Sequence, residues 1–201
     1  MKDFVHLHLH TEYSLLDGAC RTAEVPEAAK RLGQSAVAVT DHGVMFAAVE
    51  FYDACKKCGV KPIIGCEVYV ARRTRSDRVH ALDAHPYHLT LLCRNAGGYK
   101  NLIKLVSLAY TEGFYSKPRV DRELLGKYSG GLIALSGCMF GEVAVKLRDG
   151  DRDGARETAL FYNDMFGSGN YYIEVQNHGT KDDLRLMNGL FALSAETGIP
   201  T

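Results

Sequence analysis

The chain has 201 residues, of which 46% are hydrophobic and 24% are charged, and this composition is ordinary for a globular protein with one well-buried domain. Its 24 Lys and Arg residues balance 24 Asp and Glu residues, which excludes a global positive field that would gather nucleic acid without preference. Any contact with DNA must therefore be local.

Short apolar runs alternate with amphipathic helical patterns along the chain. Runs rich in Val, Ile, Leu or Tyr predict strands at residues 4–9, 36–40, 62–71, 88–93, 132–136 and 171–176. Helical periodicity predicts helices at residues 26–32, 45–57, 99–110, 122–128, 142–147, 153–166 and 182–197. Because strand and helix alternate, we expect parallel pairing in a barrel or an open α/β sheet. Residues 199–201 read as the start of another strand, so we expect the fold to be cut there.

The six cysteines are scattered along the chain, and their use indicates the redox state of the cellular compartment. The sequence shows neither a signal-peptide pattern nor an apolar run long enough to span a membrane, so we expect a reduced, cytoplasmic protein with no membrane partner. Cys55 and Cys58 fit a Cys-x-x-Cys pattern, but no second pair completes a zinc site. The basic stretch at residues 72–78 is interpreted as a solvated loop, with phosphate contact as the alternative.

The clearest chemical signal is His8-Leu9-His10 at the end of the first predicted strand. Residues two apart on a strand point the same way and stand about 7 Å apart, so both imidazoles can converge on one cation. In parallel α/β folds the loops after the strands share one face and supply the active site. Further candidates lie after or within predicted strands, namely Asp17, Asp41, His42, Glu67, Cys138 and His178. His88 is the exception, because it precedes its apolar run.

These residue types together favour a multi-metal hydrolase. Imidazole, carboxylate and thiolate ligands fit zinc, or manganese and iron where oxygen ligands dominate. Glu67 is flanked by apolar residues, and burying its carboxylate without a cation or partner would be costly. Two or more neighbouring cations favour cleavage of phosphoesters. Asp41 is better suited to orienting a ligating histidine than to binding metal, and His80 and His85 are interpreted as bystanders.

The segments that carry these residues resemble the PHP (polymerase and histidinol phosphatase) domain. They are residues 4–14 (FVHLHLHTEYS), 40–43 (TDHG), 62–67 (PIIGCE) and 136–138 (SGC), and the resemblance runs from residue 4 to the last residue. Within the family they are most similar to the N-terminal PHP domains of bacterial replicative DNA polymerase III alpha subunits. Asp17 and Cys138 favour that branch, because stand-alone PHP phosphatases usually carry histidines there.

The resemblance implies a distorted (β/α)7 TIM-like barrel over residues 1–201, truncated at the C-terminus, with up to three divalent ions at one mouth. The implied ligands are His8, His10 and Glu67 for the first ion, Glu67, His88 and Cys138 for the second, and Asp17 and His42 for the third. An Asp-x-His pair of the family lies on the next strand, beyond this chain. The implied ions are zinc or manganese, with magnesium or iron as alternatives.

The resemblance also implies a function. His8, His10, His42 and Glu67 would support a metal-dependent 3′-5′ exonuclease, and Asp41 and His178 would orient ligands or contact substrate. The substrate would be a single-stranded or frayed DNA 3′ end, edited within a replicase. Nucleotidyl transfer, the remaining polymerase domains and contacts with other replicase subunits would belong to the longer parent. Two alternatives stay open: a non-catalytic structural platform, and a stand-alone phosphatase of the histidinol-phosphatase type.

Overall fold

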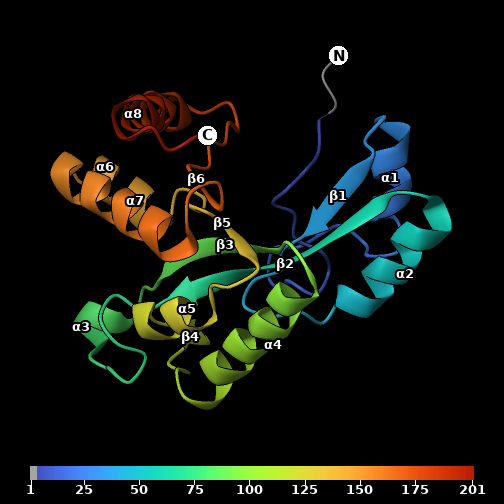
Figure 1. Cartoon of the computed structure of the whole chain (residues 1–201), viewed down its shortest axis with the longest axis horizontal. Coiled ribbons are helices and arrows are strands. Elements are labelled where there is room, and N and C mark those ends of the chain that lie inside the picture. The colour runs from blue at the N-terminus through green and yellow to red at the C-terminus, as the bar shows by residue number, and fades with distance from the viewer. Residues whose placement is uncertain (1–3) are drawn as a thin grey trace.

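The computed structural model describes residues 4–201 as a mixed α/β fold, as the sequence predicts (Figure 1). The strands are β1 (Ala36–Val39), β2 (Lys61–Val70), β3 (Tyr87–Cys93), β4 (Arg119–Val120), β5 (Leu132–Leu135) and β6 (Tyr171–Tyr172). The helices are α1 (Val25–Arg31), α2 (Ala48–Cys58), α3 (His80–Asp83), α4 (Ala96–Thr111), α5 (Arg122–Tyr128), α6 (Glu142–Arg148), α7 (Arg152–Phe166) and α8 (Lys181–Thr197). Each predicted helix has a counterpart, whereas α3 and β4 were not expected from the sequence.

The strands form one sheet in the order β1-β2-β3-β5-β6, with β4 paired to β2. Residues 61–64 of β2 pair in parallel with β1, and residues 65–70 pair with β3. Since β3 runs antiparallel to both β2 and β5, the prediction of parallel pairing throughout is wrong. Within residues 4–201 the sheet stays open and does not close into a barrel.

The first expected strand, residues 4–9, is not a strand. The segment still lies beside β1, because the Ala38 amide donates to the His6 carbonyl and the Thr40 amide to the Leu9 carbonyl, both at 2.9 Å. From the first bond to the second, the donor moves by two residues, from Ala38 to Thr40, whereas the acceptor moves by three, from His6 to Leu9. The two segments therefore do not form a regular ladder. At the other end of the sheet, the Ile173 amide donates to the Pro200 carbonyl at 2.9 Å, so the segment after α8 runs beside the one that follows β6.

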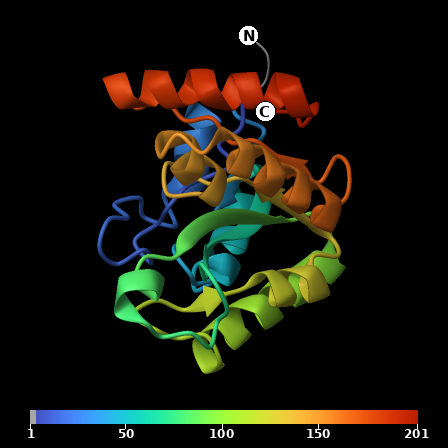
Figure 2. The ribbon, with the colours of Figure 1, turned by 90° about the vertical axis from the view of Figure 1, so that its left-hand side faces the viewer.

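Two hydrophobic cores pack under the helices on one face of the sheet, and a small third cluster of Ala38, Leu92 and Leu135 lies on the other face. The smaller joins β1 to α1 and α2 and contains Phe51 and the free thiols of Cys55 and Cys58. The larger joins β2, β3 and β5 to helices α4 to α8 and contains Cys66 and Val68. In Figure 2, α6, α7 and α8 lie above the curved sheet and α4 and α5 lie below it. All five helices pack on the same face, because the strand residues of the larger core lie opposite one another in the strand pairs. Successive strand residues point to opposite faces, so Glu67 is directed away from the larger core.

The basic loop after β2 is mostly exposed, as expected of a solvated loop, but two of its arginines pair with carboxylates of the fold. Arg73 pairs with the buried Asp83 at 2.6 Å, and Arg75 pairs with Asp121 at 2.9 Å. These arginines therefore hold the loop against the protein. No helix within residues 4–201 combines the length and apolar character that a membrane span needs.

Candidate metal centre

The reversed direction of β3 explains the position of His88. Because β3 is antiparallel to β2 and β5, it begins at the edge where those two strands end. The His88 amide donates to the Phe140 carbonyl at 3.1 Å, in the loop after β5. Gly137 makes this approach possible: its φ is +86°, and a Cβ there would lie 2.6 Å from the His88 carbonyl oxygen. Cys138 is thereby placed beside His88, although 50 residues separate them.

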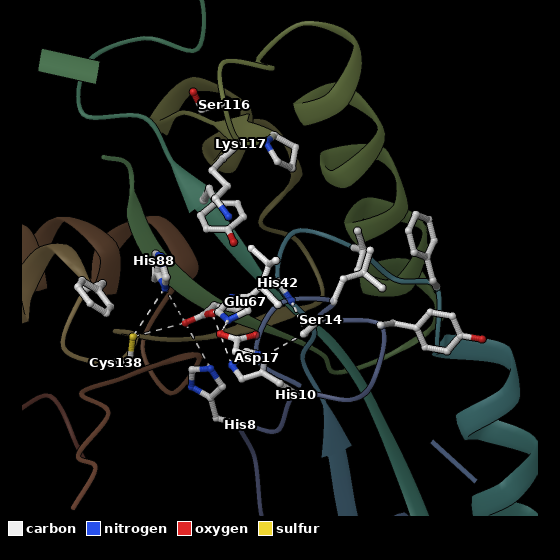
Figure 3. A pocket seen from close by; sticks show the side chains of 18 of the residues that line it. His8, His10, Ser14, Asp17, His42, Glu67, His88, Ser116, Lys117 and Cys138 are labelled. Carbon is white, nitrogen blue, oxygen red and sulfur yellow. Dashed lines mark hydrogen bonds and ion pairs between the residues drawn. The ribbon is translucent and has the colours of Figure 1, made fainter. Parts of the chain in front are cut away.

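Glu67 lies at the centre of the expected ligands (Figure 3). Its side chain is 1% exposed, and one or the other carboxylate oxygen faces each of five neighbours. The distances are 3.3 Å to His8 Nε2, 3.6 Å to His10 Nε2, 2.5 Å to His42 Nδ1, 3.1 Å to His88 Nδ1 and 3.6 Å to Cys138 Sγ. Asp17 joins through His42, whose Nε2 lies 3.1 Å from Asp17 Oδ2. The fold thus brings all the residues expected as ligands to one place.

The donor atoms form two overlapping groups that fit a divalent cation. One group is His8, His10 and Glu67, the other is His42, Glu67 and His88, and within each the donor atoms lie within 4.8 Å of one another. Glu67 Oε2 and His42 Nδ1 are both buried and lie 2.5 Å apart, but among residues 4–201 neither atom makes a hydrogen bond of suitable geometry. Buried polar atoms without well-formed hydrogen bonds are costly, and a cation between these ligands would satisfy them. Nitrogen, oxygen and sulfur donors together suit zinc or a similar ion.

The pKa values reflect the same crowding. Burial alone would raise the pKa of Glu67, but the imidazoles of His42, His8 and His88 outweigh it and hold the pKa far below its usual range. Burial would lower the pKa of His8, yet Glu174 and Glu67 raise it to about 10. Burial, reinforced by the charge of Glu67, raises the pKa of the Cys138 thiol to about 12. A thiolate at this position therefore requires a cation to stabilise it.

Asp41 holds the loop at residues 11–18 and reaches a histidine ring only through Ser14, whose hydroxyl lies 3.5 Å from His10 Nδ1. Its carboxylate accepts hydrogen bonds from the Thr11 amide at 2.6 Å and from the Ser14 hydroxyl at 2.8 Å. Gly18 closes this loop, since a Cβ there would lie 1.8 Å from the Thr11 carbonyl oxygen. Asp41 thus positions the chain between His10 and Asp17, without the direct contact to an imidazole that the sequence suggests.

The sequence analysis missed Glu174. Its Oε1 lies 2.5 Å from His8 Nδ1 and accepts a hydrogen bond from Gln176 Nε2 at 2.6 Å. His8 therefore lies between two carboxylates, one on each ring nitrogen, which is the arrangement that orients metal-binding histidines. The signal was available: Glu174 follows β6 between Ile173 and Val175, just as Glu67 is flanked by apolar residues.

A cavity of about 750 Å³ opens over the centre. His178 lines it without touching the ligands, and its Nδ1 lies 3.7 Å from Asp183. His80 begins α3 and His85 follows it, and neither lines the cavity.

In a comparison with known protein families, the model of the PHP domain matches residues 6–178 of the chain. The chain is 48% identical over 198 residues to DNA polymerase III subunit alpha of Treponema pallidum, 47% over 206 residues to that of Deinococcus radiodurans, and 42% over 198 residues to that of Borreliella burgdorferi. These alignments cover 98% of the chain but only 15–17% of the relatives' length.

Two solved structures share the fold at low identity. One, from Bifidobacterium adolescentis, is assigned to the metal-dependent phosphoesterases, with a TM-score of 0.60, 12% identity, and coverage of 99% of this chain and 85% of that one. The other is an amidohydrolase from Chromobacterium violaceum, with a TM-score of 0.50, 16% identity, and coverage of 97% and 84%. At these identities the likeness concerns the fold alone.

Proposed function

The chain belongs to the PHP domain family, and from this premise we propose that it is the metal-dependent phosphoesterase domain of a DNA polymerase III alpha subunit. Its activity would be 3′-5′ exonucleolytic removal of nucleotides from a single-stranded or frayed DNA 3′ end. Polymerisation would belong to the rest of the subunit. The partners of this domain would be the remaining polymerase domains and the other replicase subunits. The domain would complete a distorted seven-stranded barrel, and the pairing of Ile173 with Pro200 supports growth of the sheet at that edge.

One observation carries the proposal: a buried carboxylate, Glu67, is shared by two groups of imidazoles at the floor of a cavity. A structural metal site is normally closed, whereas a catalytic site leaves room for water and substrate. Here the cavity begins at the ligands themselves, since His8, His10, His42 and His88 all line it. Divalent cations in such a site lower the pKa of a bound water and neutralise charge on a phosphodiester.

The chain's own residues would hold this arrangement in place. Glu67 would bring the two groups of ligands together, and Glu174 would fix the ring of His8 from its far side. Asp41 would keep the loop of Asp17 folded over His42. His178 lines the cavity apart from the ligands, which suits contact with the substrate.

Digestion of a 5′-labelled single-stranded oligonucleotide by the full-length protein tests the proposal. We expect products shortened from the 3′ end, dependent on divalent metal and lost in His8→Ala and in Glu67→Ala. His80→Ala is the matched control, because that imidazole lies outside the centre. Circular dichroism of each variant confirms that the fold persists.

The alternatives give different results. Digestion that survives both substitutions identifies a contaminating nuclease and refutes the proposal. Stoichiometric metal binding without digestion by the wild type supports the structural platform. Hydrolysis of histidinol phosphate in preference to DNA supports a phosphatase.

A further inference from the structure

Exposed apolar side chains gather around the metal centre. Leu16 is 93% exposed, Phe46 68% and Phe114 50%, and all three line the cavity. Large apolar groups in water are costly, and their clustering around a polar centre marks a ligand-binding wall. The cavity of about 750 Å³ is larger than a phosphate requires and has room for a nucleotide.

Two aromatic residues of this wall directly follow ligand segments. Tyr13 comes three residues after His10, and Phe46 four residues after His42. Their ring centroids are 6.4 Å apart at 68°, and the Tyr13 hydroxyl donates to Glu50 of α2 at 3.1 Å. Tyr13 is therefore held against the protein, and Phe46 packs edge-on to it with most of its ring exposed.

Among the described residues, 4–201, Lys117 is the only Lys or Arg that lines the cavity. Its Nζ lies 5.2 Å from the centre of the Tyr69 ring, and that ring lies 6.1 Å from the His42 ring and 5.1 Å from the His88 ring. The Tyr69 ring thus lies close to both the ammonium and two of the ligands, and Figure 3 shows Lys117 on the same side of the centre as His88 and Ser116. Within residues 4–201 the lysine that forms an ion pair with a carboxylate is Lys146, with Glu142, and not Lys117.

The loop that carries Lys117 is rigidly anchored. Ser116 has φ +59°, and within the described part of the chain it is the only residue other than glycine with a positive φ. Arg119 is fully buried, and its guanidinium donates to the carbonyls of Gly113, Arg75 and Asp77 at 3.1, 3.0 and 2.8 Å. Backbone strain persists where the surroundings impose it, and it is concentrated at functional sites.

We propose that this cavity contains a subsite for the terminal nucleotide of a single-stranded nucleic acid, in which the base stacks on Phe46 and Lys117 binds a phosphate. The inference rests on the proposed function and adds the groups that select the substrate. Stacking on an aromatic side chain accepts every base, and an unpaired ammonium is a phosphate contact. A duplex end would have to fray first, because one base must leave its stack to reach Phe46.

Binding to two oligonucleotides tests the stacking. Both carry a hydrolysis-resistant phosphorothioate at the last linkage, and they differ in having a normal or an abasic 3′-terminal nucleotide. We expect the full-length, metal-loaded protein to prefer the normal terminus by about 5- to 150-fold, the range that corresponds to stacking of one base. Phe46→Ala should abolish the preference, and Phe46→Trp should keep it. Phe191→Ala is the matched control, since that ring is 47% exposed on α8 and lies outside the cavity.

Salt dependence tests Lys117. Lys117→Gln should weaken binding of both oligonucleotides equally and should reduce the slope of log K against log salt by about 0.7, the value for one phosphate contact on a single strand. Equal affinity of the wild type for the two termini, or no binding of either, overturns the subsite. The binding measurements do not depend on digestion. Metal-dependent hydrolysis without a base preference in binding leaves the proposed function standing. Base-dependent binding without hydrolysis supports the subsite alone.

Discussion

Replacing Glu67 by glutamine should weaken both groups of metal ligands at once. Glu67 is the one residue that the two groups share, so its carboxylate is a donor to each. Glutamine keeps the size of the side chain but removes the negative charge, and its amide nitrogen cannot act as a ligand. His10→Ala, in contrast, should weaken only the group to which that imidazole belongs.

The magnitude follows from ligand chemistry and linkage. Loss of a residue that merely supports a ligand lowers metal affinity by about 10- to 100-fold, so loss of the shared carboxylate should cost at least about 100-fold. At a free metal concentration of about 100 times the wild-type Kd, binding stabilises the fold by about 2.7 kcal/mol, and in the variant by about 0.4 kcal/mol. In a chain of 201 residues the difference of about 2.3 kcal/mol corresponds to about 5 to 9 °C in Tm.

Thermal unfolding with and without metal, together with a zinc titration against a chromophoric chelator, provides the assay. Asp83→Asn is the matched control, because Asp83 is also 1% exposed but pairs with Arg73 away from the centre. The control substitution should lower Tm but should leave unchanged the rise in Tm that metal causes. The reasoning is refuted if Glu67→Gln loses one metal equivalent and retains the other at wild-type affinity.

Three further results are expected. The pKa of His8 is raised from its ordinary 6.5 to about 10, so its stabilising contribution is complete below pH 6.5 and is lost as the pH rises towards 10. The unfolding free energy of chelator-treated protein should fall over that interval, and less steeply in His8→Gln. Asp41→Asn should cost about 1 to 3 kcal/mol and speed hydrogen exchange at residues 11–18, because the Thr11 and Ser14 hydrogen bonds weaken. Gly137→Ala should lower the unfolding free energy by about 1 to 3 kcal/mol, because φ at residue 137 is +86°. The same substitution should weaken metal binding by the group that contains His88 and spare the group that contains His8. Equal loss of metal affinity at both groups would contradict this prediction.

The sequence predicted the helices and the chemistry better than the strand directions. Helical periodicity and strand-sized apolar runs are local properties, so α2 and α8 could be located from their own residues. The antiparallel course of β3 depends on how residues 71–86 return to the sheet, which no local pattern encodes. The ligand role of His88 is therefore predicted only by the family resemblance, and the topology explains its place beside Cys138.

The candidate site was predictable where a residue type alone is informative. A glutamate among apolar neighbours indicated Glu67, but the same reasoning was not applied to Glu174. The contacts by which Asp41 would act could not be predicted, because its hydrogen bonds to Thr11 and Ser14 depend on the course of the loop and not on spacing. Segment 4–9 reads as a strand from its composition, yet its irregular bonding to β1 is set by tertiary contacts.

The change of partner along β2 has a mechanical consequence. His8, His10 and His42 come from the segments associated with the smaller core, whereas His88 and Cys138 come from strands and loops of the larger one. Glu67 lies just past the point where β2 stops pairing with β1 and begins to pair with β3. Cations held there would cross-link two packing units, so metal should make their unfolding a single concerted event, and chelation should let the unit built on β1 melt first.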